Sequence, residues 1–166
     1  MRDREERRKE CLRKCGNLLA QKNYTCARLR DKLTGAGYEE DLVAEVLESL
    51  IEAHYLDDRR YAQSFVEAQW ENRSKRRIRA DLESRGVPSQ IISEVLEEAS
   101  SERGNAAEIR QIRRLIEKRG FDPSTATWEE RSKIQAFLYR KGFGSASVRI
   151  AMNVELLDSD EFSVKN

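Results

Sequence analysis

The stretch Ile-Arg-Ala-Asp-Leu-Glu-Ser-Arg-Gly-Val at residues 78–87 decides the fold of this chain, because it is one copy of a repeated pattern. Ile78 and Leu82 lie four residues apart and therefore share one face of a helix. Gly86 follows four residues later and can adopt the left-handed conformation that ends a helix without a Cβ clash. Val87 is apolar and can fold back onto the last turn. The stretch predicts a helix that ends in a glycine-dependent turn.

The same pattern occurs once before this stretch and once after it. Its apolar pair and its glycine are Leu29, Leu33 and Gly37 in the first copy, and Ile134, Leu138 and Gly142 in the third. In each copy an apolar residue follows the glycine, and the apolar face of a second helix comes next. That second face comprises Leu42, Val43, Val46 and Leu47, then Ile91, Ile92, Val95 and Leu96, then Ser147, Val148, Ala151 and Met152, where Ser147 is the one polar exception. Agreement at so many positions in one register indicates internal repeats.

Polar side chains mark where the first helix of each pair begins. Thr25 and Ser74 stand at matching positions in the first two copies, where a hydroxyl can accept from free backbone N–H groups. In the third copy Thr127 and Glu130 have the spacing of a capping box, which predicts an earlier start. These caps place the helix starts independently of the apolar pattern.

An amphipathic segment precedes each helix pair, so that the repeat unit has three helices. Its apolar residues are Leu12, Cys15, Leu18 and Leu19, then Tyr61, Ala62, Phe65 and Ala68, then Ile109, Ile112, Leu115 and Ile116. We therefore expect an all-α protein, an elongated array of three tandem three-helix repeats. The expected domains are 1–56, a charged N-terminal arm with repeat 1; 57–104, repeat 2; and 105–166, repeat 3 with a polar C-terminal tail.

The segment Tyr-Leu-Asp-Asp at 55–58 is interpreted as the junction between the first two repeats. An aspartate before a helix can cap its free N–H groups and favourably meets the positive end of its dipole. Tyr55 and Leu56 are expected to pack against Tyr61 and Phe65 of the helix that follows. We interpret the two aspartates as structural and expect no metal site here.

Composition argues against export, membrane insertion and enzymatic chemistry. The opening residues are charged, so we expect no signal peptide, and no apolar run reaches the roughly 18 residues of a membrane helix. We therefore expect a cytoplasmic protein whose three cysteines are reduced. His54 is the only histidine, and neither a nucleophile elbow nor a phosphate-binding glycine loop is present. We expect no catalytic residues, no metal and no cofactor.

Charge is unevenly distributed although the formal net charge is only +1. Residues 73–85 hold six basic side chains against two acidic ones, and residues 131–149 hold five and none, whereas residues 39–48 hold five acids and no base. Arg28, Arg77 and Lys133 recur in register beside the apolar stripe and could form a basic line. The candidate binding residues are Arg28, Arg76, Arg77, Arg79, Lys133, Arg140 and Lys141. They could meet phosphates or an acidic protein surface.

Three segments resemble landmarks of the RecX family: Tyr-Leu-Asp-Asp-Arg-Arg-Tyr-Ala at 55–62, Arg-Ile-Arg-Ala-Asp-Leu at 77–82 with Arg-Gly-Val at 85–87, and Phe-Leu-Tyr-Arg-Lys-Gly-Phe at 137–143. The resemblance implies a monomeric, cytoplasmic regulator that lies in the groove of the RecA–DNA filament and does not bind membranes. It would limit RecA ATPase, strand exchange and coprotease activity, in homologous recombination, DNA repair and the SOS response. It would touch single- or double-stranded DNA in or beside the filament, and bind it weakly on its own.

A rival interpretation is an autonomous helical DNA-binding protein that acts on nucleic acid without RecA. The near-zero net charge argues against it, because such domains are commonly strongly basic.

Overall fold

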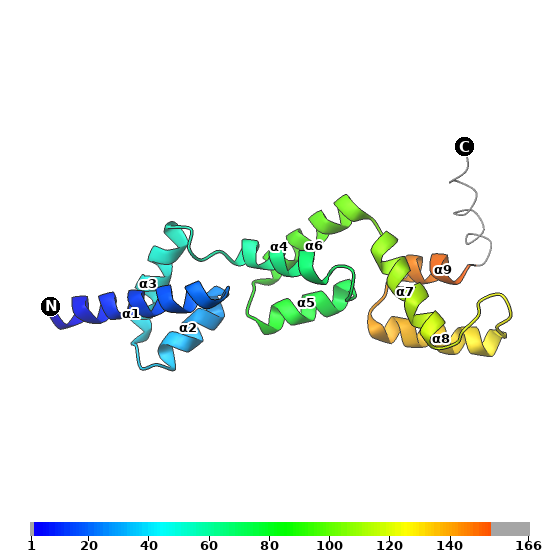
Figure 1. The fold of residues 1–166 in the computed structure, drawn as a ribbon, viewed down its shortest axis with the longest axis horizontal. Coiled ribbons are helices and arrows are strands. Elements are labelled where there is room, and N and C mark those ends of the chain that lie inside the picture. The colour runs from blue at the N-terminus through cyan, green and yellow to red at the C-terminus, as the bar shows by residue number, and fades with distance from the viewer. Residues whose placement is uncertain (1, 154–166) are drawn as a thin grey trace. The chain divides into compact units, whose positions relative to one another are not determined.

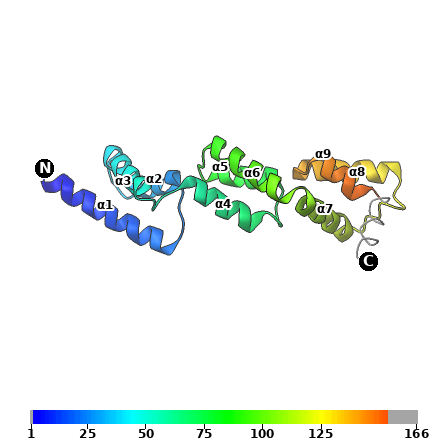
Figure 2. The ribbon, with the colours of Figure 1, turned by 90° about the horizontal axis from the view of Figure 1, so that it is seen from above.

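The computed structural model describes residues 2–153, and in this range the regular elements are all α-helices, with no strand. They are α1 (Arg2–Gln21), α2 (Cys26–Thr34), α3 (Glu40–Glu52), α4 (Asp58–Gln69), α5 (Lys75–Ser84), α6 (Ser89–Arg103), α7 (Ala106–Lys118), α8 (Trp128–Lys141) and α9 (Ser145–Met152) (Figure 1, Figure 2). The expected all-α class is confirmed. The expected polar tail at 154–166 lies outside the described residues. Among residues 2–153, none of the helices combines the length and apolarity needed to cross a bilayer.

The described chain divides into two compact units, each with its own interior. Among the described residues, one unit comprises 2–67 together with 81–95, and the other comprises 68–80 together with 96–153. Helices α1, α2 and α3 belong to the first unit, and α7, α8 and α9 to the second. Helices α4, α5 and α6 contribute residues to both.

The core of the first unit forms where α1, α2 and α3 bring their apolar faces together. Cys11 and Cys15 of α1 are fully buried there, which confirms that Cys15 fills the apolar face of this helix. Leu56 is also in this core, at 2% exposure. Tyr55, by contrast, is 69% exposed. The expectation that Tyr55 and Leu56 pack together onto α4 was therefore wrong, because Leu56 turns back into the preceding core.

The glycine-dependent turn has the same geometry in all three copies. Gly37, Gly86 and Gly142 have φ of +86°, +77° and +94°, in the left-handed region that favours glycine. The residue after each glycine donates its N–H to the carbonyl five residues before it, as in a Schellman motif. These bonds are Tyr38 to Leu33, Val87 to Leu82 and Phe143 to Leu138, each 3.2 Å long. The predicted helix terminator is confirmed in every copy.

The predicted hydroxyl caps are confirmed, and each makes a second bond that the sequence did not reveal. Thr25 Oγ1 accepts from the N–H of Arg28 at 3.2 Å and donates to the carbonyl of Arg85 at 2.6 Å. Ser74 Oγ accepts from Arg77 at 3.2 Å and donates to the carbonyl of Lys141 at 3.0 Å. Arg85 and Lys141 each directly precede a turn glycine. Each hydroxyl thus joins the start of one repeat's helix pair to the turn of the next repeat.

This join brings the two backbones close together at Gly86 and Gly142. A Cβ on Gly86 would lie 2.4 Å from the Cβ of Ala27, and one on Gly142 would lie 2.7 Å from the Cβ of Arg76. A Cβ on Gly37 would meet nothing within 4 Å. The glycines of the second and third copies therefore serve both the left-handed turn and the close approach, whereas Gly37 serves only the turn.

Carboxylates accept hydrogen bonds from backbone N–H groups at the N-termini of several helices. Asp57 Oδ1 accepts from the N–H of Arg60 at 3.0 Å, which confirms the predicted aspartate cap of α4. Thr127 and Glu130 form the predicted capping box of α8. The buried Glu108 of α7 accepts from the N–H of Gly144 at 3.2 Å and from the hydroxyl of Ser147. Ser147, the polar exception in the repeat pattern, is thus buried because α7 supplies its hydrogen-bond partner.

Replacing Gly86 by Val should destabilise the protein more than replacing Gly37 by Val. Positive φ costs a β-branched residue about 1–2 kcal/mol at either site, and overpacking against Ala27 should add roughly 1–3 kcal/mol at Gly86 alone. Urea unfolding followed by circular dichroism measures both changes in the free energy of unfolding. Equal losses would show that the contact with Ala27 relaxes at no cost, and no loss at Gly86 would contradict its role as a terminator.

The three thiols should be free but slow to react in the folded protein. All three cysteines are unpaired in the structure. Burial raises the pKa of Cys15 to about 12, and burial together with the Asp58 carboxylate raises that of Cys26 to about 12. Burial also raises the pKa of Cys11. Because the thiolate is the reactive form, Cys15 and Cys26 should react about a thousandfold more slowly than free thiols near pH 8.

Titration with a thiol reagent near pH 8, without reductant, measures the number of free thiols and how fast each reacts. Three thiols should react promptly after unfolding in urea. A single reactive thiol in the unfolded chain would indicate a disulfide, and prompt reaction of all three in the folded chain would contradict their burial.

Candidate functional site

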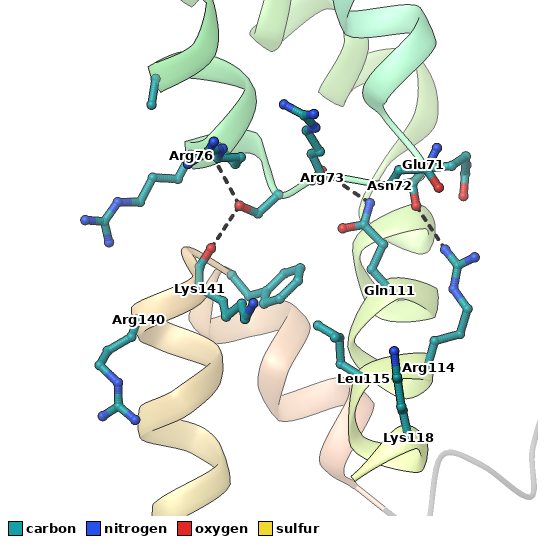
Figure 3. A pocket seen from close by; sticks show the side chains of 14 residues that line it. Glu71, Asn72, Arg73, Arg76, Gln111, Arg114, Leu115, Lys118, Arg140 and Lys141 are labelled. Atoms are coloured by element: carbon teal, nitrogen blue, oxygen red, sulfur yellow. Dashed lines mark hydrogen bonds between the residues drawn. The ribbon is translucent and has the colours of Figure 1, made fainter.

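The second unit contains a cleft of about 740 Å³ that is lined mainly by basic side chains (Figure 3). The start of α5, the segment before it, one face of α7 and the end of α8 form its walls. We call it the basic cleft. Its cationic residues are Arg73, Arg76, Arg77, Arg114, Lys118, Arg140 and Lys141, and its one acidic residue is Glu71.

The hydroxyl cap of α5 explains why basic residues from two helices meet here. Ser74 bonds to the carbonyl of Lys141, so the first turn of α5 lies beside the last turn of α8 (Figure 3). The first turn of α5 carries Arg76 and Arg77, and the last turn of α8 carries Arg140 and Lys141. Four of the seven predicted binding residues are thereby brought into one site.

Helix α7 forms the opposite wall and is tied to the segment before α5. The amide of the buried Gln111 donates to the carbonyls of Trp70, at 2.7 Å, and Arg73, at 3.3 Å. Arg114 donates to the carbonyl of Glu71 at 2.9 Å. The Glu71 carboxylate itself pairs with Arg110 at 2.9 Å. The one acid of the lining is therefore already neutralised by a cation from α7.

Reasoning from the sequence did not single out Arg114 and Lys118, although a signal was present. Arg110, Arg114 and Lys118 recur every four residues and so share one side of α7. That row alone predicts a solvated helix face. Only the folded chain shows that the row faces the basic residues of α5 and α8 across a cleft.

Three of the cations in the cleft are uncommitted in the part of the chain that the structure describes. Arg76, Lys118 and Arg140 are exposed and make no side-chain hydrogen bond or ion pair there. The Lys141 ammonium, in contrast, lies 5.5 Å from the ring centre of Phe137. Like charges gathered in this way favour an anionic ligand, since an anion lowers their mutual repulsion. Ser74, the one hydroxyl residue of the lining, is used in capping, so the arrangement favours anion binding over catalysis.

The first unit contains a smaller cleft, of about 500 Å³, at the same register of the repeat. Its residues Lys22, Asn23, Arg28 and Arg85 correspond to Glu71, Asn72, Arg77 and Lys141 of the basic cleft.

In this smaller cleft, Lys22 and Arg85 already interact with aromatic side chains of the same unit. The Lys22 ammonium lies 5.0 Å from the ring centre of Tyr24, and Arg85 lies 4.5 Å from that of Phe65. Arg85 also donates to the hydroxyl of Tyr61 at 3.1 Å. Asp31 contributes a carboxylate to the lining. This cleft therefore offers less free positive charge than the basic cleft.

The remaining predicted residues are placed separately. Arg28 lines the smaller cleft of the first unit, and Lys133 lines a further hollow of the second unit, beside Phe137. Arg79 is half-buried and lines none of these three hollows. Arg28, Arg77 and Lys133 are all exposed, as their register predicts, but they line three different hollows. Their action as one basic line stays a prediction.

Comparisons with known proteins agree with the repeat architecture. Sequence models of the first, second and third three-helix domains of RecX match residues 11–50, 57–96 and 107–152. The crystal structure of RecX from Lactobacillus salivarius is similar with a TM-score of 0.76, over 94% of this chain and 98% of that one, at 22% identity. That likeness bears on the fold, and it supports three tandem three-helix domains.

Curated relatives are similar over most of the chain. The regulatory protein RecX of Trichlorobacter lovleyi is 35% identical over 144 residues, which cover 84% of this chain and 92% of the relative. The regulatory protein RecX of Thermus thermophilus is 41% identical over 113 residues, which cover 63% of this chain and 78% of the relative. With three family domains matched in order and relatives of this similarity, the chain belongs to the RecX family.

Proposed function

We propose that the protein binds the RecA–DNA filament and restrains it, lowering RecA ATPase, strand exchange and coprotease activity. The observation that carries the proposal is the match to all three RecX domains, together with relatives that are named regulatory proteins. A regulator of this kind acts by occupying a surface of its partner. It needs no catalytic residue and no cofactor.

The basic cleft supports this proposal. A RecA–DNA filament presents phosphates and protein carboxylates, and both complement exposed arginine and lysine side chains. Arg76 and Arg140 are exposed and uncommitted, so their charges are available to such a partner. We expect the protein to act as a monomer in the cytoplasm, where RecA works, and to bind DNA weakly on its own.

The DNA-dependent ATPase rate of RecA tests the proposal. At sub-stoichiometric amounts, the protein should lower this rate on single-stranded DNA, because a filament bound at a few positions can no longer grow or turn over freely. Indifference of RecA, combined with tight binding of the protein to bare DNA, would instead favour an autonomous DNA-binding protein.

Changing Arg28, Arg77 and Lys133 together to Glu should weaken binding to the filament and leave helicity unchanged. The three side chains are exposed, so the core should survive a swing of six charges. The logarithm of the binding constant falls linearly with the logarithm of the salt concentration. For each phosphate of a single strand that the variant no longer neutralises, this slope should become shallower by about 0.7. If the partner is an acidic protein surface, the weakening should fall mainly on the association rate at low salt.

The matched control is the triple change of Arg13, Lys14 and Arg30 to Glu. It alters the charge by the same amount at exposed positions outside the three hollows. Filament binding and ATPase inhibition are measured for both variants across salt concentrations. Equal behaviour of the two variants would show that the basic line is an ordinary solvated face.

A further inference from the structure

We propose that the acidic segment at residues 154–166 docks in the basic cleft of the same molecule and competes there with external anions. These residues lie outside the described part of the chain. Three observations support the proposal: the charge of the segment, the place where it leaves α9, and the uncommitted cations of the cleft. The proposal goes beyond the function proposed above, and it concerns a contact that the chain makes with itself.

The charge of the chain changes sign close to its last helix. Residues 131–149 hold five basic side chains and no acid, whereas residues 154–161 hold four acids and no base. Lys165 is the one basic residue of the acidic segment, which therefore has a formal charge of −3. A strongly anionic segment is thus covalently attached to the unit that contains the basic cleft. Its acids are Glu155, Asp158, Asp160 and Glu161.

The uncommitted cations of the cleft match this charge. Arg76, Lys118 and Arg140 are exposed and make no side-chain hydrogen bond or ion pair among the described residues. Figure 3 shows Arg76 and Arg140 on one side of the cleft and Lys118 on α7 at the other. Carboxylates that enter between them would lower the repulsion of these like charges. Each exposed ion pair contributes little by itself, so several pairs must form together.

An apolar contact is available between the charges. Figure 3 shows the half-buried side chain of Leu115 pointing from α7 into the cleft. In the acidic segment, Leu156 and Leu157 stand between Glu155 and Asp158. Acids that flank apolar residues would thereby meet cations that flank an apolar residue. A purely ionic ligand gains nothing from Leu115, so this feature favours a protein segment as the occupant.

The attachment point places the acidic segment beside the cleft. Helix α9 packs against α7, with Met152 in the same core as Ile112 and Ile116. Helix α7 also forms one wall of the cleft. Fully extended, the thirteen residues 154–166 span roughly 43 Å. This is about twice the length of α7, which is about 20 Å at 1.5 Å per residue, so the segment can reach the whole cleft.

Tethering compensates for the weakness of the individual ion pairs. A ligand attached through a short linker has an effective concentration on the order of millimolar. An external anion must compete with that concentration, so its apparent affinity falls by the fraction of molecules in which the cleft is free. The acidic segment would thus act as a built-in competitor that only a ligand with many charges displaces.

Cross-linking with a water-soluble carbodiimide tests the contact in the full chain. The reagent joins an ammonium and a nearby carboxylate through an amide bond, with loss of water. At low salt, Lys118 should be joined to the acidic segment, and mass spectrometry of the digested protein identifies the joined peptides. Lys133 is exposed on the same unit outside the cleft and should be joined far less. The yield should not depend on protein concentration, because the contact lies within one molecule.

Calorimetric titration with inorganic polyphosphate tests the competition. The test variant changes Glu155 and Glu161 to Gln, and Asp158 and Asp160 to Asn. If the segment occupies the cleft nine-tenths of the time, this variant should bind polyphosphate about tenfold more tightly than the parent at low salt. The gain should disappear in 1 M salt, where the screening length is only about 3 Å.

The matched control removes the same number of charges at exposed acids outside the three hollows. It changes Glu6, Glu48, Glu52 and Glu97 to Gln. The control should bind polyphosphate nearly as the parent does. Circular dichroism checks that both variants fold. Adding Lys118→Gln and Arg140→Gln to the parent and to the test variant should abolish the difference between them, because the segment then has little to bind.

Four results would overturn the proposal. Test and control variants of equal affinity would show that the segment does not compete, and a gain that persists without Lys118 and Arg140 would place it elsewhere. Cross-links to Lys133 as abundant as those to Lys118 would show that the segment has no preferred position. A yield that rises with protein concentration would assign the contact to a second copy of the chain. RecA takes part in none of these measurements, so their outcome is independent of the proposed function.

Discussion

The buried hydroxyls of Thr25 and Ser74 each make two hydrogen bonds on which the arrangement of the neighbouring helices depends. In one bond the hydroxyl accepts from a free backbone N–H at the start of a helix. In the other it donates to the carbonyl of the residue before a turn glycine of the next repeat. A buried hydroxyl without partners would be costly, so both bonds favour one relative position of the two segments. This relative position also requires glycine at Gly86 and Gly142, because a Cβ there would collide with the helix whose start the hydroxyl caps.

The position of the basic residues follows from this join. The end of α8 meets the start of α5 in the second unit, and the residues at those ends are arginines and lysines. The equivalent join in the first unit produces a cleft in the same register, but there aromatic rings and Tyr61 engage the cations. A repeated scaffold thus presents two related clefts of different chemistry, because function depends on the surface and not on the fold.

A net charge near zero does not prevent such a protein from having a strongly basic site. The acids of α3 pair in part with the N-terminal arm, as Arg4 does with Asp41 at 3.0 Å and Arg8 with Glu45 at 2.8 Å. Exposed pairs of this kind stabilise a fold by little, about 1 kcal/mol or less. They do, however, neutralise part of the positive charge of α1. The lining of the basic cleft holds seven basic residues and one acidic residue, Glu71, which is paired with Arg110, so the field there stays positive.

The sequence by itself determined the helices, their caps and the glycine turns, because these depend on side chains within a few residues of one another. Apolar spacing, Thr25, Ser74, the capping box at Thr127 and the three glycines all act locally, and the structure agrees with each. Only the tertiary structure decided which basic residues share a site. Arg114 and Lys118 join Arg76 and Arg140 through bonds between segments far apart in the chain. Tyr55 is exposed, whereas Leu56 lies in the core of the preceding helices. Such placements depend on how packed helices meet, and local spacing along one helix carries no information about the helix that faces it.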